Sequence, residues 1–228
     1  KESLTDRPDA QSQAGNVFGS IAQAAVDANR THKGLFAELA IPITKTLEAQ
    51  VAVRRDQYPG QGQTSPKVAM KWTPASSFAV RASYAESFLA PSLKQLYGGQ
   101  DEGAESTSDP VICAAFPTIS GTCSNFPYKE ISGSNPNLKP ETGKTFNIGF
   151  IFEPVNAVAV GIDFWRIQKQ DEINTLTVES AIEQGNFATV NGEGVVFVNN
   201  ANVAATENQG VDLDFRVRVG DTPFGRLT

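Results

Sequence analysis

The chain has 228 residues, 40% of them hydrophobic, and its 25 acidic and 19 basic residues give a formal net charge of −6. A chain without a basic surplus cannot neutralise a phosphate backbone, so the composition argues against a nucleic-acid partner. The sequence contains no run of about 18 apolar residues, which excludes a transmembrane helix. A membrane-spanning β-strand needs only about 9 to 11 residues, half of them apolar, and such strands are compatible with the composition.

Seven segments alternate apolar and polar residues with a period of two, which predicts β-strands that each have one apolar face. They comprise residues 34–43, 46–55, 67–74, 77–86, 143–153, 156–168 and 209–219, and an eighth strand is expected to start near Phe224. In the segment 143–153, for example, Phe146, Ile148 and Phe150 share one side. The chain is therefore predicted to be all-β.

The connections between the predicted strands alternate between short and long. Residues 44–45, 75–76 and 154–155 read as tight hairpin turns, whereas residues 56–66, 87–142 and 169–208 read as long loops. Loops of the greatest of these lengths are uncommon in a compact soluble domain. A large transmembrane β-barrel, by contrast, has short periplasmic turns at one rim and long extracellular loops at the other. We therefore expect an antiparallel up-and-down meander that is part of such a barrel, with its strands within residues 34–219.

The same alternation of connections places residues 1–33 in a further outer loop, since the first strand must then run inward from the outside. Within that loop, residues 19–30 could form a short helix.

The side of the strands opposite the apolar face carries charged residues, and we expect it to face the barrel lumen. Unpaired buried charge is costly, so these side chains must meet water or charges of opposite sign. The candidates for this lumen-facing set are Arg81, Asp163, Trp165, Asp212, Asp214, Arg216 and Arg218. They could be solvated, ion-paired wall residues, or they could line a ligand path or contact a plug domain.

The only two cysteines, Cys113 and Cys123, lie in "CAAFPTISGTC" within the longest predicted loop. A disulfide between them would stabilise the fold by roughly 3 kcal/mol on the chain-entropy estimate. It would also indicate an oxidising compartment. Two reduced, half-buried cysteines are the alternative.

Catalytic and metal chemistry are poorly supported by the sequence. His32 is the only histidine, no nucleophile motif surrounds a serine or cysteine, and we interpret His32 as a solvated loop residue. We therefore expect neither an enzyme nor a cofactor. The acidic stretch "QDEGAESTSD" could offer Asp101, Glu102, Glu105 and Asp109 to a calcium ion, but the spacing matches no calcium loop, and a solvated surface run is the other interpretation.

Four stretches resemble hallmark motifs of TonB-dependent outer-membrane receptors, in the same order and spacing. They are "RRDQYPGQGQTSPKVAMKWTP" (54–74), "VRASYAESFLAPSLKQLYGG" (80–99), "NPNLKPETGKTFNIGF" (135–150) and "NQGVDLDFRVRV" (208–219). The resemblance spans roughly residues 34 to 220. One departure is Leu89, which stands where the family usually has arginine, and this puts a charge-based role of that position in doubt.

The resemblance implies a barrel of about 22 strands around an N-terminal plug, of which residues 1–228 would be an internal fragment without the plug. It implies TonB-energised uptake of a scarce nutrient (siderophore, haem, cobalamin or oligosaccharide) across the bacterial outer membrane. The implied partners are the nutrient at the outer loops, outer-membrane lipid, the plug domain of the same parent chain and the TonB complex.

Two other kinds of protein stay open at the level of sequence. A soluble secreted all-β binding or adhesion module would pack the apolar faces on one another, and a hydrolase on a β scaffold would depend on Asp163 or Asp212. A barrel fragment would also have two unpaired sheet edges and a bare apolar side, so the isolated fragment is expected to self-associate or collapse.

Overall fold

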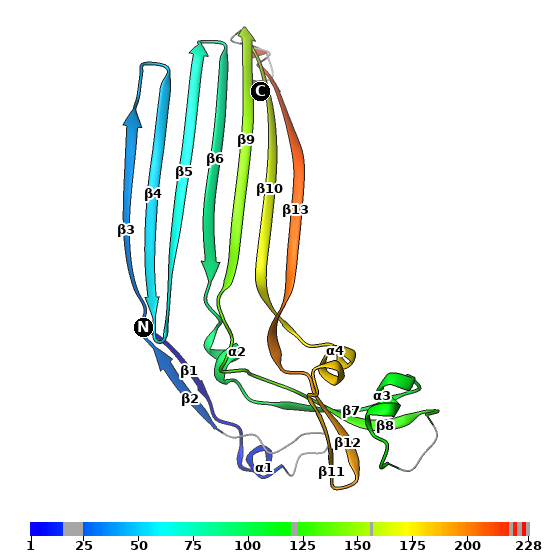
Figure 1. Ribbon diagram of the computed structural model, residues 1–228. Helices are drawn as coiled ribbons and strands as arrows, with labels where there is room; N and C mark the ends of the chain where they lie inside the picture. The colour runs from blue at the N-terminus through cyan, green and yellow to red at the C-terminus, as the bar shows by residue number, and fades with distance from the viewer. Residues whose placement is uncertain (16–24, 120–122, 156, 219–220, 223–224, 227–228) are drawn as a thin grey trace. The chain divides into compact units, whose positions relative to one another are not determined.

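The computed structural model describes residues 1–15, 25–119, 123–155, 157–218, 221–222 and 225–226. The chain forms two compact units, and each unit combines stretches that are far apart in the sequence (Figure 1). Unit 1 comprises residues 1–31, 90–141 and 171–204, and unit 2 comprises residues 32–89, 142–170 and 205–228. Among the described residues, no helix has the length and apolar character that crossing a bilayer requires.

Unit 2 is built on a seven-stranded sheet in the order β13-β10-β9-β6-β5-β4-β3 (Figure 1). The strands are β3 (Lys33–Pro42), β4 (Leu47–Tyr58), β5 (Gln61–Ala75), β6 (Phe78–Leu89), β9 (Glu141–Val155), β10 (Val158–Thr175) and β13 (Asn200–Val217). Each strand lies beside its neighbour in this chain order, so the sheet is an up-and-down meander. The predicted all-β meander is confirmed, and each of the seven predicted segments corresponds to one of these strands.

The turns of this sheet fall at its two ends. In Figure 1 the turns after β3, β5 and β9 lie at one end of the sheet and the β4–β5 turn lies at the other. The predicted long loop at 56–66 is wrong, because Tyr58 pairs with Gln61 and only Pro59 and Gly60 form the turn. The strands continue here with polar residues on both faces. Backbone hydrogen bonds between strands need only an extended chain, whatever the side chains are. Apolar alternation therefore predicts strands that end before the observed ones do.

Strands β10 and β13 also extend into the range 169–208 that we expected to be a loop. The helix considered within residues 19–30 is wrong for Val26–Arg30, which form strand β2 and pair with β1 (Glu2–Asp6). Residues 16–24 lie outside the described part, as does Phe224, where an eighth strand was expected. Short strands β14 (Asp221–Thr222) and β15 (Gly225–Arg226) pair near it.

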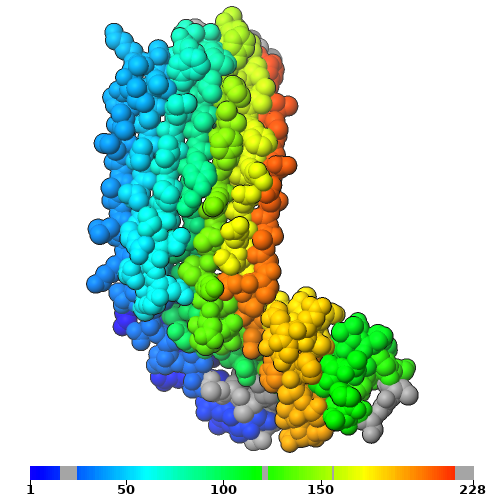
Figure 2. Space-filling model, in the orientation of Figure 1, coloured from blue at the N-terminus to red at the C-terminus, as the bar shows by residue number. Residues whose placement is uncertain are grey.

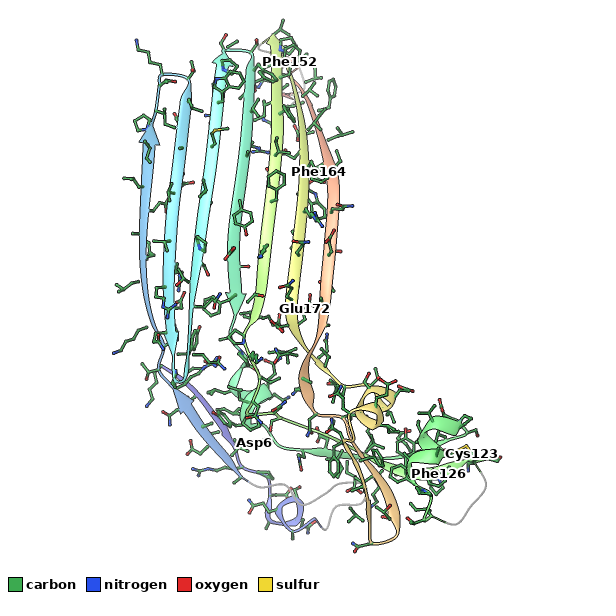
Figure 3. All side chains as sticks on the ribbon, viewed as in Figure 1. Asp6, Cys123, Phe126, Phe152, Phe164 and Glu172 are labelled. Carbon is green, nitrogen blue, oxygen red and sulfur yellow. A yellow bond between two sulfur atoms is a disulfide. The ribbon has the colours of Figure 1, made fainter. Side chains whose placement is uncertain are left out.

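One face of the unit 2 sheet is apolar and exposed. Leu35, Leu213 and Phe215 are 80%, 76% and 71% exposed, and several apolar residues of the inner strands, such as Met70 and Phe150, are 44% and 42% exposed. Side chains stand out on both sides of the sheet, with Phe152 at the end that carries the β9–β10 turn and Phe164 further along β10 (Figure 3). In Figure 2 the side chains of neighbouring strands lie against one another across the sheet. Every buried hydrophobic residue of the described chain belongs to unit 1 instead.

Unit 1 contains a four-stranded sheet in the order β11-β12-β8-β7, in which β12 and β8 are parallel. The strands are β7 (Asp101–Thr107), β8 (Phe126–Ser132), β11 (Phe187–Val190) and β12 (Glu193–Phe197). The helices of the unit are α1 (Ala10–Gln13), α2 (Leu93–Tyr97), α3 (Pro110–Ala115) and α4 (Val178–Glu183). Unit 1 thus has the mixed strand directions and short elements that period-two patterning does not reveal.

The helices of unit 1 begin at polar caps that the sequence supplies. Asp109 accepts a hydrogen bond from the Val111 amide at the start of α3, and Pro110 occupies the first turn, where its missing N–H costs nothing. Thr177 caps α4 in the same way. Ser92 and Gln95 form a reciprocal capping box at α2.

The core of unit 1 lies between helices α3 and α4 and the small sheet. It contains Ile112, Phe116, Phe126, Tyr128, Leu176, Ala181, Val196 and Val198. The ring of Phe116, which is 1% exposed, stacks on Phe126 and meets the edge of Phe187 at centroid distances of 6.0 and 5.5 Å. Unit 1 therefore has an interior of its own.

Candidate functional site

The charged face of the unit 2 sheet holds an ion pair that spans three strands. The Arg81 guanidinium of β6 donates to both carboxylate oxygens of Asp163 on β10, at 3.0 and 2.6 Å. The strand between them, β9, carries Gly149 opposite Asp163. A Cβ at Gly149 would overlap the Asp163 carboxylate and lie 2.8 Å from Arg81 Nε. The pair therefore passes over Gly149, which has no side chain to block it.

Trp165 and Asp214 lie on the same face as this pair. The indole of Trp165 covers Gly210 of β13, where a Cβ would come within 2.7 Å of the ring. Asp214 Cβ lies beside Gly161, which stands two residues before Asp163 on β10. Four of the seven predicted lumen-facing residues are thus brought to one face of one sheet. Whether that face borders a lumen belongs to the proposal made below.

The other three predicted residues lie after Gly210, with Asp212 and Arg216 on β13 and Arg218 just beyond its end. Asp212 and Arg216 alternate with the exposed Leu213 and Phe215, which places them on the charged face. Arg216 and Arg218 line a small hollow of about 90 Å³ together with Glu153 and residues 157–159. In the part of the chain that the structure describes, no ion pair involves Asp212, Arg216 or Arg218.

A broad hollow of about 810 Å³ lies over the charged face near the β3–β4 turn. Small residues such as Ala40, Ala69 and Ser83 form its floor. Lys67, Lys71, Arg81 and Glu48 surround them. An excess of cationic groups beside small residues can accept water, anions or an acidic protein surface.

Two ionic clusters on unit 2 were not predicted. Arg54 donates to both oxygens of Asp56, at 2.6 and 2.9 Å, and Asp56 is 2% exposed. Arg166 and Gln168 both donate to Glu207 Oε2, at 2.7 and 2.8 Å. Asp56 and Glu207 were missed because both fall in ranges that we expected to be loops. Continued alternation of polar residues past the apolar stretches was the signal that could have found them.

His32 is exposed, as expected, but it has a partner. Its ring stacks on Tyr58 at 5.3 Å, and Tyr58 meets the edge of Phe88 at 6.0 Å. Tyr58 and Phe88 also line a hollow of about 300 Å³ with Arg54, Asp56 and Glu86 among its other walls. Aromatic rings beside a guanidinium and two carboxylates form a surface suited to contact with a polar ligand, not a catalytic centre.

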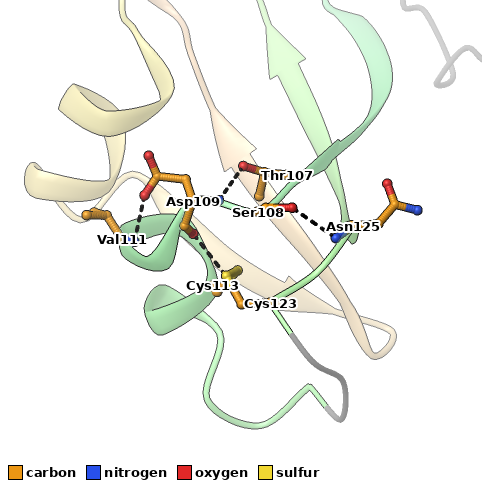
Figure 4. The surroundings of a disulfide bond; sticks show 7 residues. All are labelled: Thr107, Ser108, Asp109, Val111, Cys113, Cys123 and Asn125. Carbon is orange, nitrogen blue, oxygen red and sulfur yellow. Dashed lines mark hydrogen bonds between the residues drawn. A yellow bond between two sulfur atoms is a disulfide. The ribbon is translucent and has the colours of Figure 1, made fainter.

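The predicted disulfide between Cys113 and Cys123 is present in unit 1. Figure 4 shows how the chain is held around it: the Cys123 Sγ lies 3.4 Å from the Asp109 carbonyl oxygen, and the Asn125 amide donates to Ser108 Oγ. The same Asp109 caps helix α3, which carries Cys113. The Asp109 cap holds the start of α3, and the disulfide links the same helix to Cys123. Both constraints act on the segment that supplies Ile112 and Phe116 to the core.

The acidic stretch at 100–109 is not an open calcium loop. It forms strand β7, in which Glu102 pairs with Lys129 at 3.0 Å, while Asp109 serves as a helix cap. Lys129 also pairs with Glu193 of β12 at 3.1 Å, so its ammonium group joins strands on both sides of β8. Within the described residues, no group of histidine, cysteine or acidic side chains could hold a metal ion.

Burial changes the acidity of two neighbouring groups on β8. It raises the pKa of the Glu130 carboxyl above its ordinary value of 4.5, with a smaller contribution from Glu105. It also raises the pKa of the Tyr128 hydroxyl, again with smaller contributions from nearby carboxylates. The Glu102 hydrogen bond in turn raises the pKa of Lys129. The environment in this sheet thus favours the charged form of Lys129 and disfavours the charged form of the half-buried Glu130.

Together these features describe one unit with a sheet that is apolar on one face and ion-paired on the other, and a second unit with its own core. The wall of a transmembrane β-barrel is built from such two-faced strands. A family model described as TonB dependent receptor-like, beta-barrel, matches residues 3–228, and the chain belongs to this family. Its members are transport receptors, not enzymes. A comparison with curated proteins found no match.

Solved structures share the fold. A mutant of the ferric enterobactin receptor (PfeA) from Pseudomonas aeruginosa, in complex with enterobactin, is 17% identical with a TM-score of 0.69, over 92% of this chain and 28% of that one. The siderophore receptor PirA from Acinetobacter baumannii is 16% identical with a TM-score of 0.64, over 83% of this chain and 26% of that one. The chain spans about a quarter of the length of these two receptors.

Proposed function

We propose that this chain forms part of the wall and the outer loops of a bacterial outer-membrane receptor that imports a scarce small nutrient with energy supplied through TonB. Siderophore-bound iron is the first candidate, because the similar structures include proteins named as a siderophore receptor and a ferric enterobactin receptor. Haem, cobalamin and oligosaccharide are the other members of the proposed nutrient class.

The observation that carries the proposal is the two-faced sheet of unit 2. Leu213 and Phe215 are largely exposed on one face, while Arg81 and Asp163 pair on the other. Hydrocarbon tails outside and water or a plug inside would satisfy both faces. A soluble adhesion module is not favoured, because it would bury the apolar face, whereas the buried hydrophobic residues of the described chain all lie in unit 1.

The composition of unit 1 supports an assignment of this unit to the outer surface. Its segments 1–31, 90–141 and 171–204 nearly coincide with the stretches 1–33, 87–142 and 169–208 that we expected in outer loops. Its disulfide is also a bond that persists in an oxidising environment. In this proposal unit 1 meets the nutrient first, and the charged face of unit 2 meets the plug domain of the parent chain.

The proposal is tested on the intact parent receptor in its own bacterium. Cells with and without the receptor gene are starved of iron and supplied with radioactive ferric enterobactin, haem-bound iron or labelled cobalamin. We expect uptake of one of these compounds that requires the receptor and stops when a protonophore or loss of TonB removes the energy source. Equal uptake of every compound in the two strains would contradict a role in import of these nutrients.

The membrane assignment has a separate test. The purified parent receptor should need detergent to stay dispersed and should migrate differently on gels before and after heating, as folded barrels do. A parent protein that is monomeric without detergent and insensitive to heating would overturn the assignment and would restore the soluble-module interpretation.

A further inference from the structure

Unit 1 contains a hollow of about 350 Å³ that none of the features above explains, and we name it the amide hollow. Its walls come from three stretches of unit 1: residues 134–137, Leu176 with residues 184 and 186, and residues 197–201. The full lining is Ser134, Asn135, Pro136, Asn137, Leu176, Gln184, Asn186, Phe197, Asn199, Asn200 and Ala201. Its volume lies within the range of small-molecule sites, about 300–1,000 Å³.

The lining of the amide hollow is polar and carries no charged side chain. Six of its side chains are carboxamides, and Phe197, Leu176 and Pro136 are its main apolar members. A carboxamide both donates and accepts hydrogen bonds, so it is matched to groups that also do both. Hydroxyl groups have this property, whereas a carboxylate, phosphate or ammonium group would find no countercharge here.

The walls of the hollow are fixed to one another by backbone hydrogen bonds. The Leu176 amide donates to the Asn199 carbonyl at 3.2 Å, and the Phe197 amide donates to the Asn186 carbonyl at 2.9 Å. The Asn200 amide donates to the Gly133 carbonyl at 3.0 Å. All three stretches that form the walls are therefore held in place without a ligand, and such preorganisation reduces the entropic cost of binding.

Some of these carboxamides form hydrogen bonds within the chain, and others do not. Asn135 is structural, because its Nδ2 donates to the Asn200 carbonyl at 2.8 Å and its Oδ1 accepts from the Asn137 amide at 2.9 Å. The side chains of Asn186, Asn199 and Asn200 take part in no hydrogen bond within the described part of the chain. Asn199 Oδ1 is buried without a partner, the only such side-chain atom among the described residues. This oxygen has almost no accessible surface, so a ligand in the hollow would meet the other carboxamides without a partner, those of Asn186 and Asn200.

We propose that the amide hollow binds an uncharged, polyhydroxylated group, the chemistry of a sugar ring. Ring hydroxyls would exchange hydrogen bonds with the side chains of Asn186 and Asn200, while the C–H faces of the ring would lie against Phe197 or Leu176. The sugar could belong to a compound that the receptor takes up or to the saccharide part of surrounding lipopolysaccharide. Binding at this hollow is a property of unit 1 and does not depend on the proposed import of iron.

The test uses the intact parent receptor in lauryldimethylamine oxide, because detergents with sugar head groups would compete for the hollow. The probes are the methyl glycosides of glucose, galactose and mannose, and the core oligosaccharide released from lipopolysaccharide. Binding is measured by saturation-transfer NMR and by titration calorimetry. We expect at least one probe to bind; binding of a methyl glycoside indicates a sugar carried by a nutrient, and binding of the core oligosaccharide alone indicates the lipopolysaccharide.

Two variants and a matched control locate the binding. Asn200→Ala and Asn186→Ala should each weaken binding of the probe about tenfold, the effect of one lost hydrogen bond. Asn29→Ala, the same substitution at an exposed position on β2 of the same unit, should bind as the parent does. Because neither Asn186 nor Asn200 loses a side-chain hydrogen bond within the described part of the chain, both variants should unfold at about the temperature of the parent.

The proposal is overturned if none of the probes binds, since the hollow would then hold only water. It is also overturned if a probe binds equally well to the parent, to Asn200→Ala and to Asn186→Ala. Should Asn200→Ala fail to fold, Asn186→Ala alone decides, because Asn186 accepts the hydrogen bond of the Phe197 amide with its backbone carbonyl, which survives the substitution.

Discussion

The two units place their apolar side chains in opposite ways. Unit 1 turns them inward, as Phe116 and Val196 show with 1% and 0% exposure, and it reinforces this interior with a disulfide. Unit 2 turns them outward on one face of a sheet whose other face is ionic. The difference teaches that the same residue types can indicate a core or a surface toward hydrocarbon. What distinguishes them is whether short elements enclose them or long strands display them.

The largest expected effect comes from one substitution made in both units. Phe116→Ala should destabilise unit 1 by about 3–5 kcal/mol, because it leaves a cavity between Phe126 and Phe187. Phe150→Ala removes a ring that is 42% exposed on the sheet, and it should cost less than about 1 kcal/mol. Hydrogen exchange of amides in β12 and β9 of the parent receptor measures both. Equal destabilisation by the two substitutions would contradict the contrast between the units.

Loss of the disulfide should act on unit 1 alone. Cys113→Ser should destabilise that unit by about 3 kcal/mol, since the closed loop spans only 10 positions. The exchange protection of β8 and β12 should fall, while that of β5 and β6 should stay unchanged. Reduction of the unsubstituted receptor with dithiothreitol provides the matched measurement, because it opens the same bond without changing any side chain.

A single arginine can test what the outward face touches. Leu213→Arg should destabilise the receptor in lipid vesicles by about 2 kcal/mol, because a guanidinium would enter hydrocarbon. Asp212→Arg introduces the same residue at the adjacent position, on the charged face, and should cost markedly less. Urea unfolding from vesicles measures the difference. If Leu213→Arg proves the milder of the two, the apolar face does not meet lipid.

The smallest effect concerns the pH dependence of unit 1. Burial raises the pKa of Glu130, so folding favours its protonated form, and stability should fall as pH rises above its ordinary pKa of 4.5. Glu130→Gln should remove that fall, which makes unit 1 relatively more stable at neutral pH. Glu183→Gln, at an exposed position of α4, controls for the loss of one negative charge. Thermal melts at several pH values compare the three proteins.

Much of unit 2 could be predicted from the sequence, because the period-two alternation of large apolar residues indicates its strands. The turns after β3, β5 and β9 were also predictable from the few residues between the alternating runs. The Arg81–Asp163 pair was not, although both residues were singled out. Its partners lie two strands apart, and only the register of β6, β9 and β10 shows that Gly149 stands between them.

Unit 1 was predicted only in part. Its disulfide could be inferred from two cysteines in one loop, but its core could not. Strand β12 pairs in parallel with β8, so Val195 lies opposite Lys129 across more than sixty residues of chain. Short strands and helices of four to six residues leave no periodicity strong enough to reveal such a pairing. The amide hollow has the same origin, because its walls come together only through these long-range contacts.

The missing side chain at Gly149 has a consequence for how the sheet is assembled. If the register of a strand shifts by one position, each of its residues moves to the opposite face of the sheet. Such a shift is unfavourable because it places polar side chains on the apolar face and apolar side chains on the charged face. A slip by two positions keeps each residue on its proper face, yet it moves a carboxylate by about 7 Å along the strand. In that shifted register, Arg81 can no longer form its ion pair with Asp163 across Gly149 of β9. The ion pair therefore stabilises the native register of the three strands relative to registers shifted by two positions, which the pattern of polar and apolar faces does not disfavour.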